Sequence, residues 1–409
     1  MAANIAIFPL QPQIQAIRQY NRTFNHLERF NDKKLFKRYR FELDGIEFIC
    51  DLVREDLERA SGRSMALTVE IQVLLALRFF ASGAFLEAIG DTLGVDKGSV
   101  SRAVRDVSAA LHRRRDEFIK WPIQVEERRK VQMGFYNISG FPRVLGCIDG
   151  THVRIICPNA PLLPVEAPPP PPPPPADDEE QLPQQAQPMP NAARPEEDPH
   201  DDDPQQPQQQ GRVPNYEASF VNRKGYHSLN IQAVCDHTGK FTNIVAKWPG
   251  ATHDSYIFRN SALSVHMEAN NPRGEDGMML GDSGYPCRPF LITPYPNPTT
   301  PREQHFNKSL CGTRVRIEHA FGVLKRRFHV LHGEVRMQPE RVVKIVSACT
   351  VLHNIAVMRG EREPPEDESD NSDLENNDID SDSDSDGGDD YDGPENGRLY
   401  RDYLATKYF

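Results

Sequence analysis

Three carboxylates in this sequence stand where their types and spacing could hold metal ions. Asp149 follows the apolar run VLGCI and Asp282 follows GMMLG, so each comes directly after a segment that is typical of a buried strand. Glu318 lies on the helical segment TRVRIEHAFGVLKRRF, with 35 residues between it and Asp282. Carboxylate oxygens are the ligands that Mg²⁺ and Mn²⁺ prefer. The three residues are therefore candidate metal ligands and candidate catalytic residues.

The chemistry that such a triad supports is attack on a phosphodiester. Two divalent ions about 4 Å apart activate a water or hydroxyl and stabilise the leaving oxygen of an in-line displacement. Gly150, next to Asp149, would leave room for a metal and a phosphate. Three cations on the same helical segment as Glu318 could neutralise phosphate oxygens or bind the nucleic-acid strand: Arg314, Arg316 and Lys325.

Each carboxylate also has a plainer explanation, and the residues alone leave both open. Asp149-Gly150 is a common hairpin pair. Asp282 could belong to a turn in DSGYP, and Glu318 could be a surface charge of its helix. The three explanations are coupled, because a single fold would bring all three carboxylates together.

The region before Asp149 has a helical pattern from about residue 20 to 135, and its middle part has the order of a helix-turn-helix. A first helix is expected over 68–82 and a second over 85–93. Gly94 supplies the turn, and Asp96 can cap a third helix that begins at about Lys97. A tight glycine-containing turn between two short helices is typical of DNA-binding proteins.

The third of these helices separates apolar from polar residues. Val100, Val104, Val107 and Leu111 recur at the spacing of one buried helical face. A plain helical bundle with an arginine-bearing solvent face is the alternative to DNA contact. If the helix does enter a groove, four short polar or cationic residues are the candidate DNA-binding positions: Ser99, Ser101, Arg102 and Arg105.

From about residue 140 the hydrophobic period changes to two, which indicates strands. VLGCID and HVRIIC are each expected to be a strand, and GYHSLNIQAVCD and KFTNIVAKW are expected to pair through a turn at 236–239. A helix should follow over about 252–269, with Asp254 near its start. We interpret Asp254 mainly as an N-cap, with an accessory role in the site as the alternative.

Further segments complete an α/β pattern. A short apolar strand ends at Asp282, and helices are expected around Glu318 and over 339–358. Three antiparallel strands, a helix, a strand and further helices predict a mixed sheet flanked by helices, of the ribonuclease-H-like kind. On the helix around Glu318, five residues at spacings of three and four form the face that should pack on the sheet: Ile317, Ala320, Phe321, Leu324 and Phe328.

The net charge of −11 conceals a strong segregation. Residues 158–214 hold 11 acidic and 2 basic side chains and 19 of the 35 prolines, and residues 361–397 hold 17 acidic and 1 basic. Both compositions predict disorder. The rest of the chain has 31 acidic and 45 basic residues, a net of +14. A basic body suits a polyanionic partner, although ordinary domains also reach such charges.

These changes in pattern divide the chain into five parts. No run of about 18 apolar residues and no signal peptide is evident, so no membrane partner is expected. The seven cysteines include no C-x-x-C pair, which favours reduced thiols over a zinc ribbon or a disulfide framework. The predicted parts are a helical region at 1–135 with the helix-turn-helix at about 68–115, a catalytic domain at 136–157 plus 215–360, a disordered insertion at 158–214, a disordered acidic tail at 361–397, and a short C-terminal helix at 398–409.

Several motifs, in order, resemble the PIF/Harbinger family of DDE transposases and the nucleases domesticated from them. They are GCIDGTHVRI, FVNRKGYHSLNIQAVCD, WPGATHDSYIF, LGDSGYP, RVRIEHAFGVLKRRF and CTVLHNIAVM. The resemblance covers about 140–157 and 215–360 closely and the helical region more loosely. It implies a ribonuclease-H-like fold, a triad of Asp149, Asp282 and Glu318 that holds divalent cations, DNA as substrate and a preceding helix-turn-helix.

Two hypotheses follow from different classes of protein. The leading one is a metal-dependent DNA endonuclease that uses two Mg²⁺ or Mn²⁺ ions, either an active transposase or a host nuclease descended from one. The other is a non-catalytic DNA-binding or adaptor protein derived from a transposase. The resemblance also implies a Myb-like DNA-binding partner protein, and paired DNA ends would favour a homo-oligomer. A DNA substrate implies the nucleus, with the cytoplasm as the alternative location.

Overall fold

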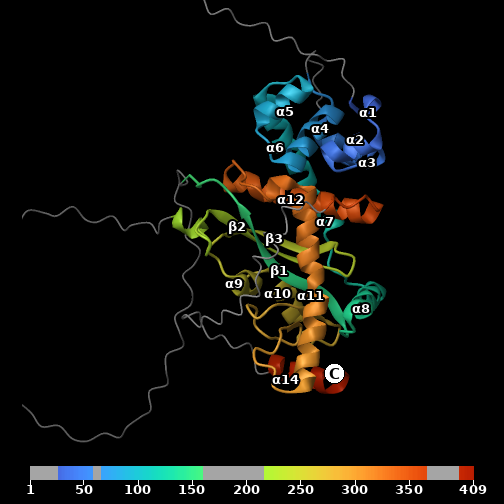
Figure 1. The fold of residues 1–409 in the computed structure, drawn as a ribbon, viewed down its shortest axis with the longest axis vertical. Helices are drawn as coiled ribbons and strands as arrows, with labels where there is room; N and C mark the ends of the chain where they lie inside the picture. Colours follow the sequence, from blue (N-terminus) through green and yellow to red (C-terminus); the bar gives the residue numbers. More distant parts are fainter. Residues whose placement is uncertain (1–25, 59–65, 160–215, 366–395) are drawn as a thin grey trace, which may run out of the picture.

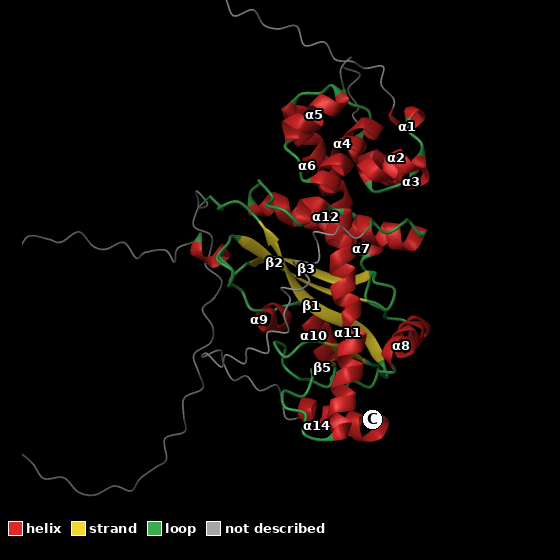
Figure 2. Ribbon diagram, in the orientation of Figure 1, coloured by secondary structure: helices red, strands yellow, loops and turns green. Residues whose placement is uncertain are grey.

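The structure is a computed structural model that describes residues 26–58, 66–159, 216–365 and 396–409. The insertion and the acidic tail predicted from the sequence lie almost entirely outside these residues. Figure 1 shows the helices between residues 26 and 113 gathered at one end of the molecule, above a sheet that the long helix α11 (Pro301–Arg327) crosses. The same division between helices and strands is visible in Figure 2.

The helical part of the chain contains the three helices expected over 68–115. Thr68 caps α4, where its Oγ1 accepts a hydrogen bond from the Ile71 amide (3.3 Å). Asp96 caps α6 by accepting from the Ser99 amide (3.1 Å). Gly94, which ends α5, has a φ of +66°, a conformation that glycine adopts without strain. The helices of this part are α1 (His26–Arg29), α2 (Asp32–Tyr39), α3 (Leu43–Leu57), α4 (Val69–Ser82), α5 (Leu86–Leu93), α6 (Lys97–Arg113), α7 (Arg115–Phe118) and α8 (Val125–Ser139).

A mixed five-stranded sheet forms the second part of the molecule, in the order β3-β2-β1-β4-β5. The pairs β1–β2 and β2–β3 are antiparallel, whereas β1–β4 and β4–β5 are parallel. The predicted α/β class is therefore confirmed, and the strands 228–235 and 241–249 pair as expected through a turn at Asp236–Lys240. The strands are β1 (Val144–Arg154), β2 (Ser228–Cys235), β3 (Phe241–Pro249), β4 (Met278–Leu280) and β5 (Leu291–Ile292).

The two strands predicted around Asp149 are a single strand, which is a correction. β1 runs without a turn from Val144 to Arg154, because its ladder with β2 continues through the pairs Asp149–Ala233 and Gly150–Gln232. The hairpin explanation of Asp149-Gly150 is therefore wrong. Asp149 nevertheless lies just beyond the end of the β1–β4 ladder, because the pairing on that side of β1 stops at Cys147.

The helix predicted over 252–269 is also two helices. α9 (Asp254–Arg259) ends before Ser261, which caps α10 (Ala262–Asn270) by accepting from the Ser264 amide (3.0 Å). The N-cap of α9 is His253, and Asp254 is the first helical residue, so the interpretation of Asp254 as the N-cap is wrong. Its carboxylate makes a different contact, described below.

Two long helices connect the sheet with the N-terminal helices. α11 begins with a capping box between Thr300 and Glu303, and α12 (Pro339–Arg359) packs against α6, α7 and β3. Among the described residues α12 alone is long and apolar enough to cross a membrane, and most of it is buried, which is typical of a core helix. The short helices η1 (Ala218–Phe220) and η2 (His329–Leu331) lie in loops, and α14 (Asn396–Tyr408) packs on α11 and β5, in the place where a C-terminal helix is predicted.

Candidate active site

Asp149 and Asp282 lie side by side because of the parallel pairing of β1 with β4. In that register Cys147 is the partner of Leu280, and each aspartate comes two residues later along its own chain segment. Side chains two residues apart point to the same face of a strand. Cys147 faces α11, where its thiol donates to the Thr313 carbonyl (3.5 Å). The face of the sheet on which Asp149 lies is therefore the face that α11 covers.

Helix α11 brings Glu318 and Arg314 to this place from one side. The two residues are one helical turn apart, and their side chains form an ion pair of 3.8 Å between Arg314 Nη1 and Glu318 Oε1. Arg314 Nη2 also lies 3.2 Å from Asp149 Oδ2. The five residues predicted to pack this helix on the sheet are all buried: Ile317, Ala320, Phe321, Leu324 and Phe328.

The electrostatics of the cluster are dominated by burial and by like charges. Burial raises the pKa of Asp149 to about 7, Arg314 opposes this shift, and the Asp282 and Asp254 carboxylates add to it. Burial would lower the pKa of Arg314, but Asp149, Asp282 and Glu318 outweigh it and raise that pKa. The cluster therefore has more negative charge than its own cation balances.

Asp254 belongs to the cluster, and Gly150 is what allows it to approach. A Cβ on Gly150 would lie 2.5 Å from Asp254 Oδ1, so any other residue at 150 would displace the carboxylate. Asn230 on β2 holds the same oxygen by donating from Nδ2 (2.8 Å). Burial raises the pKa of Asp254, and the Asp282 charge adds to this shift. The accessory role considered for Asp254 thus has a geometric basis. The space beside Gly150, which was expected to hold a metal and a phosphate, is occupied by the Asp254 carboxylate.

Tyr285 is a buried residue close to the aspartates of the cluster, and the sequence reasoning missed it. Tyr285 Oη accepts a hydrogen bond from Gln232 Nε2 (3.0 Å), and Gln232 also donates to the Asp254 carbonyl (2.9 Å). Burial raises the pKa of Tyr285 well above its usual value, and three nearby aspartates add to it, so the phenol keeps its proton. The only sequence signal was its place in LGDSGYP, three residues after Asp282.

Comparison with known proteins adds to this geometry. Residues 205–354 match the family described as DDE superfamily endonuclease, a match that contains Asp254, Asp282 and Glu318. The human protein named "Putative nuclease HARBI1" is 32% identical over 349 residues, which cover 83% of this chain and 84% of the human protein. The chain belongs to this family of Harbinger transposase-derived nucleases.

Other relatives of this nuclease come from distant organisms. The Xenopus laevis protein of the same name is 30% identical over 346 residues, covering 83% of each chain. The Arabidopsis thaliana protein named "Protein ALP1-like" is 24% identical over 345 residues, covering 80% of this chain and 71% of the plant protein. No solved structure matches the chain.

The donor set of this Harbinger-family nuclease fits a hard divalent cation. Asp149, Asp254, Asp282 and Glu318 offer only carboxylate oxygens. Burial, and secondarily the neighbouring carboxylates, raises the pKa values of Asp149 and Asp254, and a bound cation would oppose this shift. Among the described residues, however, these carboxylates do not form a group of three whose ligand atoms all lie within 4.8 Å of one another. Instead the Arg314 guanidinium lies between Asp149 and Glu318 and serves as their counter-cation.

Lys325, predicted from the sequence, and two cations that the sequence reasoning missed, Arg223 and Lys224, lie around His152. Lys325 donates to the His152 carbonyl (3.3 Å), and Arg223 donates to His253 Nδ1 (3.1 Å). Burial, together with the charges of Lys325, Lys224 and Arg223, lowers the pKa of His152 to about 4. Arg223 and Lys224 are exposed on the loop before β2. The segment FVNRKGYH was the signal that could have found them.

The predicted DNA-binding residues on α6 occupy different surroundings. Arg102 and Arg105 are exposed, whereas Ser99 accepts a hydrogen bond from Arg102 (3.0 Å) and donates to the capping Asp96. Ser101 is turned to α12, where Arg341 donates to its carbonyl (3.1 Å) and hydroxyl (3.3 Å). The apolar face of Val100, Val104, Val107 and Leu111 is buried as expected.

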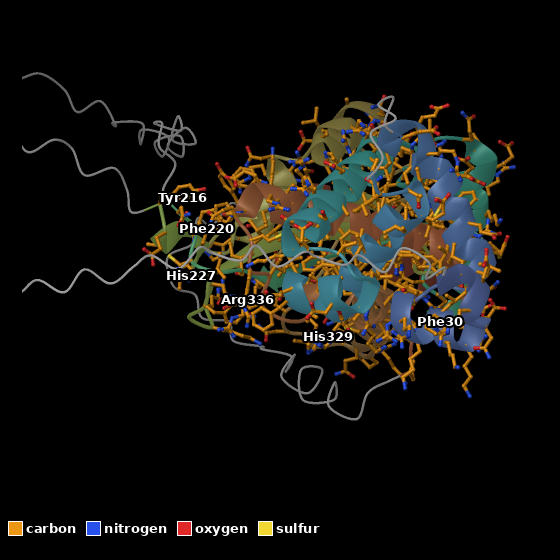
Figure 3. All side chains as sticks on the ribbon, turned by 90° about the horizontal axis from the view of Figure 1, so that it is seen from above. Phe30, Tyr216, Phe220, His227, His329 and Arg336 are labelled. Atoms are coloured by element: carbon orange, nitrogen blue, oxygen red, sulfur yellow. The ribbon has the colours of Figure 1, made fainter. Side chains whose placement is uncertain are left out.

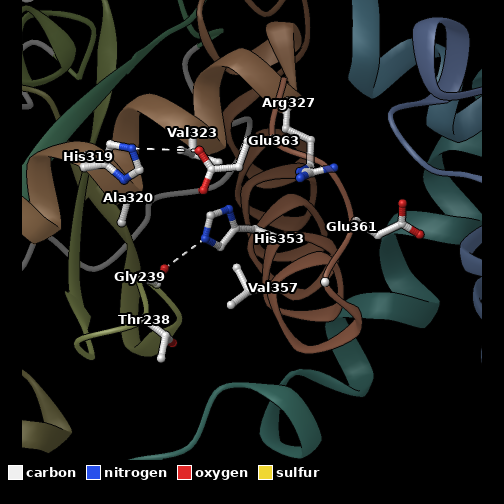
Figure 4. A pocket seen from close by; sticks show the side chains of 11 residues that line it. Thr238, Gly239, His319, Ala320, Val323, Arg327, His353, Val357, Glu361 and Glu363 are labelled. Carbon is white, nitrogen blue, oxygen red and sulfur yellow. Dashed lines mark hydrogen bonds and ion pairs between the residues drawn. The ribbon is translucent and has the colours of Figure 1, made fainter. Parts of the chain in front are cut away.

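A separate cavity lies at the C-terminal half of α11. This cavity of about 200 Å³ is lined by the β2–β3 turn, α11 and α12 (Figure 4). His353 donates from Nε2 to the Gly239 carbonyl (2.9 Å), and burial lowers the pKa of His353 to about 4. His319 and Glu363 face each other at 3.9 Å. The cavity has none of the cluster carboxylates in its wall, so it is separate from the candidate active site.

Proposed function

We propose that this nuclease is a divalent-metal-dependent DNA endonuclease with a ribonuclease-H-like catalytic domain. Asp149, Asp282 and Glu318 would hold two Mg²⁺ or Mn²⁺ ions, with Asp254 as an accessory ligand or positioning group. The observation that carries the proposal is the shared register of Asp149 and Asp282 on parallel segments, facing the helix that presents Glu318. The strand order and directions of the sheet also support the fold assignment.

Several residues around the carboxylates have distinct roles in the proposed reaction. When bound, the ions would supply an activated water and stabilise the leaving oxygen of the phosphodiester. Arg314 holds Asp149 and Glu318 together while they have no other cation, and its release would provide a guanidinium for a non-bridging phosphate oxygen. Gln232 fixes the position of Asp254 by donating to its carbonyl, and Tyr285 holds Gln232 by accepting a hydrogen bond from the same amide group.

DNA would approach along the basic groups that surround the carboxylates. Arg223, Lys224 and Lys325 lie around His152, three residues after Asp149, and they suit the backbone of a nucleic acid. Arg102 and Arg105 are exposed cations of α6, the third helix of the predicted helix-turn-helix. We propose duplex DNA as the substrate for this reason, and the nucleus as the location that such a substrate implies.

The test is nicking of supercoiled plasmid by the full-length protein with Mg²⁺ or Mn²⁺. Asp149→Asn, Asp282→Asn and Glu318→Gln should each lower the rate by at least about a hundredfold while the circular dichroism spectrum stays that of the wild type. Glu127→Gln, at an exposed carboxylate of α8, is the matched control and should cleave normally. Wild-type rates in all three triad variants would overturn the assignment.

A non-catalytic adaptor is the second candidate, since the plant relatives have names that mention no nuclease. Calorimetric titration of Mn²⁺ into the full-length protein separates the two. Binding that is lost in Asp149→Asn favours the nuclease. A wild-type protein that neither binds Mn²⁺ nor nicks DNA, but still binds duplex DNA through Arg102 and Arg105, would be the adaptor.

A further inference from the structure

We propose that Cys157, Glu217 and His227 form a zinc site that is distinct from the carboxylate cluster and outside the proposed nuclease chemistry. Their ligand atoms, one from each side chain, all lie within 4.8 Å of one another. Cys157 is eight residues beyond Asp149, which corresponds to about 25 Å along an extended strand. The site therefore lies beyond the C-terminal end of β1, whereas Asp149 lies in the middle of this strand.

The antiparallel pairing of β1 with β2 positions two of the three ligands. The ladder reaches the pair Arg154–Ser228, and the Ile155 amide then donates to the His227 carbonyl (2.9 Å). Cys157 follows two residues after Ile155, which makes it a diagonal neighbour of His227 on the same face. The opposite side of this segment is held by Val335, whose carbonyl accepts from the Ile156 amide (3.3 Å).

Glu217 reaches the same place from the turn before η1. The bridge between Val221 and His227 folds this segment back on the start of β2. The rings of Tyr216 and Phe220 pack edge to face, with centroids 5.1 Å apart. Figure 3 shows Tyr216, Phe220 and His227 together at one edge of the molecule. The backbone of each ligand is thus fixed by contacts that do not involve the site.

The three side chains form a small polar group that lacks a cation. The Cys157 thiol donates to the Glu217 carboxylate. His227 Nε2 lies 3.3 Å from Glu217 Oε1, yet this nitrogen is buried and makes no hydrogen bond. Buried polar atoms without a partner are costly, and they are uncommon in folded proteins. A cation between the three atoms would use the thiolate, the free imidazole lone pair and one carboxylate oxygen at once.

The ligand types select the metal. Zn²⁺ binds cysteine sulfur, histidine nitrogen and carboxylate oxygen in tetrahedral sites, and three protein ligands leave one position for water. Thiolate and imidazole are poor ligands for Mg²⁺, which the proposed nuclease site uses. Binding converts the Cys157 thiol to a thiolate and releases its proton to solvent. The two sites therefore take different metals and can be distinguished.

The site would act as a clamp in the chain. Cys157 and Glu217 have 59 residues between them, and a metal that joins them closes this stretch into a loop at its base. Closing a long loop through a metal restricts the unfolded chain more than closing a short one. Zn²⁺ should therefore stabilise the folded protein against heat.

The experiment uses full-length protein stripped of metal and supplied with excess Mg²⁺, into which Co²⁺ is titrated as a spectroscopic substitute for Zn²⁺. The wild type should develop a thiolate-to-cobalt charge-transfer band in the near ultraviolet that added Zn²⁺ removes. Cys157→Ser should abolish the band, and His227→Ala should abolish or strongly weaken it. Cys311→Ser is the control, because Cys311 is the other exposed cysteine in the described part of the chain.

The outcomes are separable. A band that is absent from the wild type, persists in Cys157→Ser or disappears in Cys311→Ser overturns the zinc site. A melting temperature that Zn²⁺ raises in the wild type but not in Cys157→Ser supports the clamp. Nicking of plasmid DNA reports on the triad alone, so failure of the zinc site and failure of the proposed nuclease give different results.

Discussion

The guanidinium of Arg314 lies 3.2 Å from the carboxylate of Asp149 and occupies the place of a cation in the cluster. Only 12% of the Arg314 side chain and 19% of the Asp149 side chain are exposed, so solvent screens this pair weakly. Arg314 therefore stabilises the metal-free fold, and a bound metal would take over that role.

Replacing Arg314 should destabilise the protein in a way that metal corrects. Arg314→Met keeps much of the packing but leaves Asp149 and Glu318 without their cation, and should lower the free energy of unfolding by about 2 kcal/mol. Urea unfolding with and without Mn²⁺ measures this. The loss of unfolding free energy should be smaller when Mn²⁺ is present. An equal loss in both conditions would mean that the metal does not replace Arg314 as the cation beside Asp149 and Glu318.

Metal affinity should depend on pH through Asp149. Burial raises the pKa of this carboxyl to about 7, so below that pH a proton competes with the metal. The apparent affinity for Mn²⁺ should fall by up to about tenfold for each pH unit below 7 and level off above it. In the metal-free protein the free energy of unfolding changes with pH in the opposite direction. Because the pKa of Asp149 is raised in the folded state, this carboxyl stabilises the fold at low pH, and the stabilisation is lost as the pH rises to 7. Calorimetry across this range, with Asp149→Asn as the control, checks both.

Gly150 should tolerate no side chain. In Gly150→Ala the new Cβ would meet Asp254 Oδ1 at 2.5 Å, which should displace that carboxylate, cost about 2 kcal/mol of stability and slow DNA cleavage. Gly333→Ala is the matched control, because nothing lies within 4 Å of a Cβ built there. Nicking assays and urea unfolding compare the two variants, and equal behaviour would show that Asp254 needs no such clearance.

Asn354 should be essential for the sheet. Its Oδ1 accepts from the Phe241 amide (2.8 Å), and its Nδ2 donates to the carbonyls of Phe241 (2.7 Å) and Phe118 (3.0 Å). Asn354→Ala leaves these buried groups unpaired and should cost about 3 kcal/mol of unfolding free energy. Met358→Ala, at an exposed side chain of the same helix, should cost far less. Equal midpoints in urea would contradict the role given to Asn354.

Local features of the fold could be predicted from the sequence because their causes lie within a few residues. Thr68 and Asp96 cap helices that begin where they were expected, and Gly94 ends one in the left-handed conformation. The apolar face of α11 was evident from its spacing, and Glu318 is not one of its members. Asp149 and Asp282 were singled out by their places after apolar runs, and Glu318 by its place on a helix with 35 residues between it and Asp282. Their roles as metal ligands stay a prediction.

Only the tertiary structure decided how these carboxylates meet. Asp149 stays within β1 because β2 continues to pair with it, whereas β4 stops short. Asp254 is more than a hundred residues from Gly150 along the chain, and their contact depends on the way β2 and α9 pack. The position of Arg314 between two carboxylates follows from α11 lying across the sheet. Caps and periodicity act over one or two helical turns, while strand pairing and helix packing join residues that no local pattern connects.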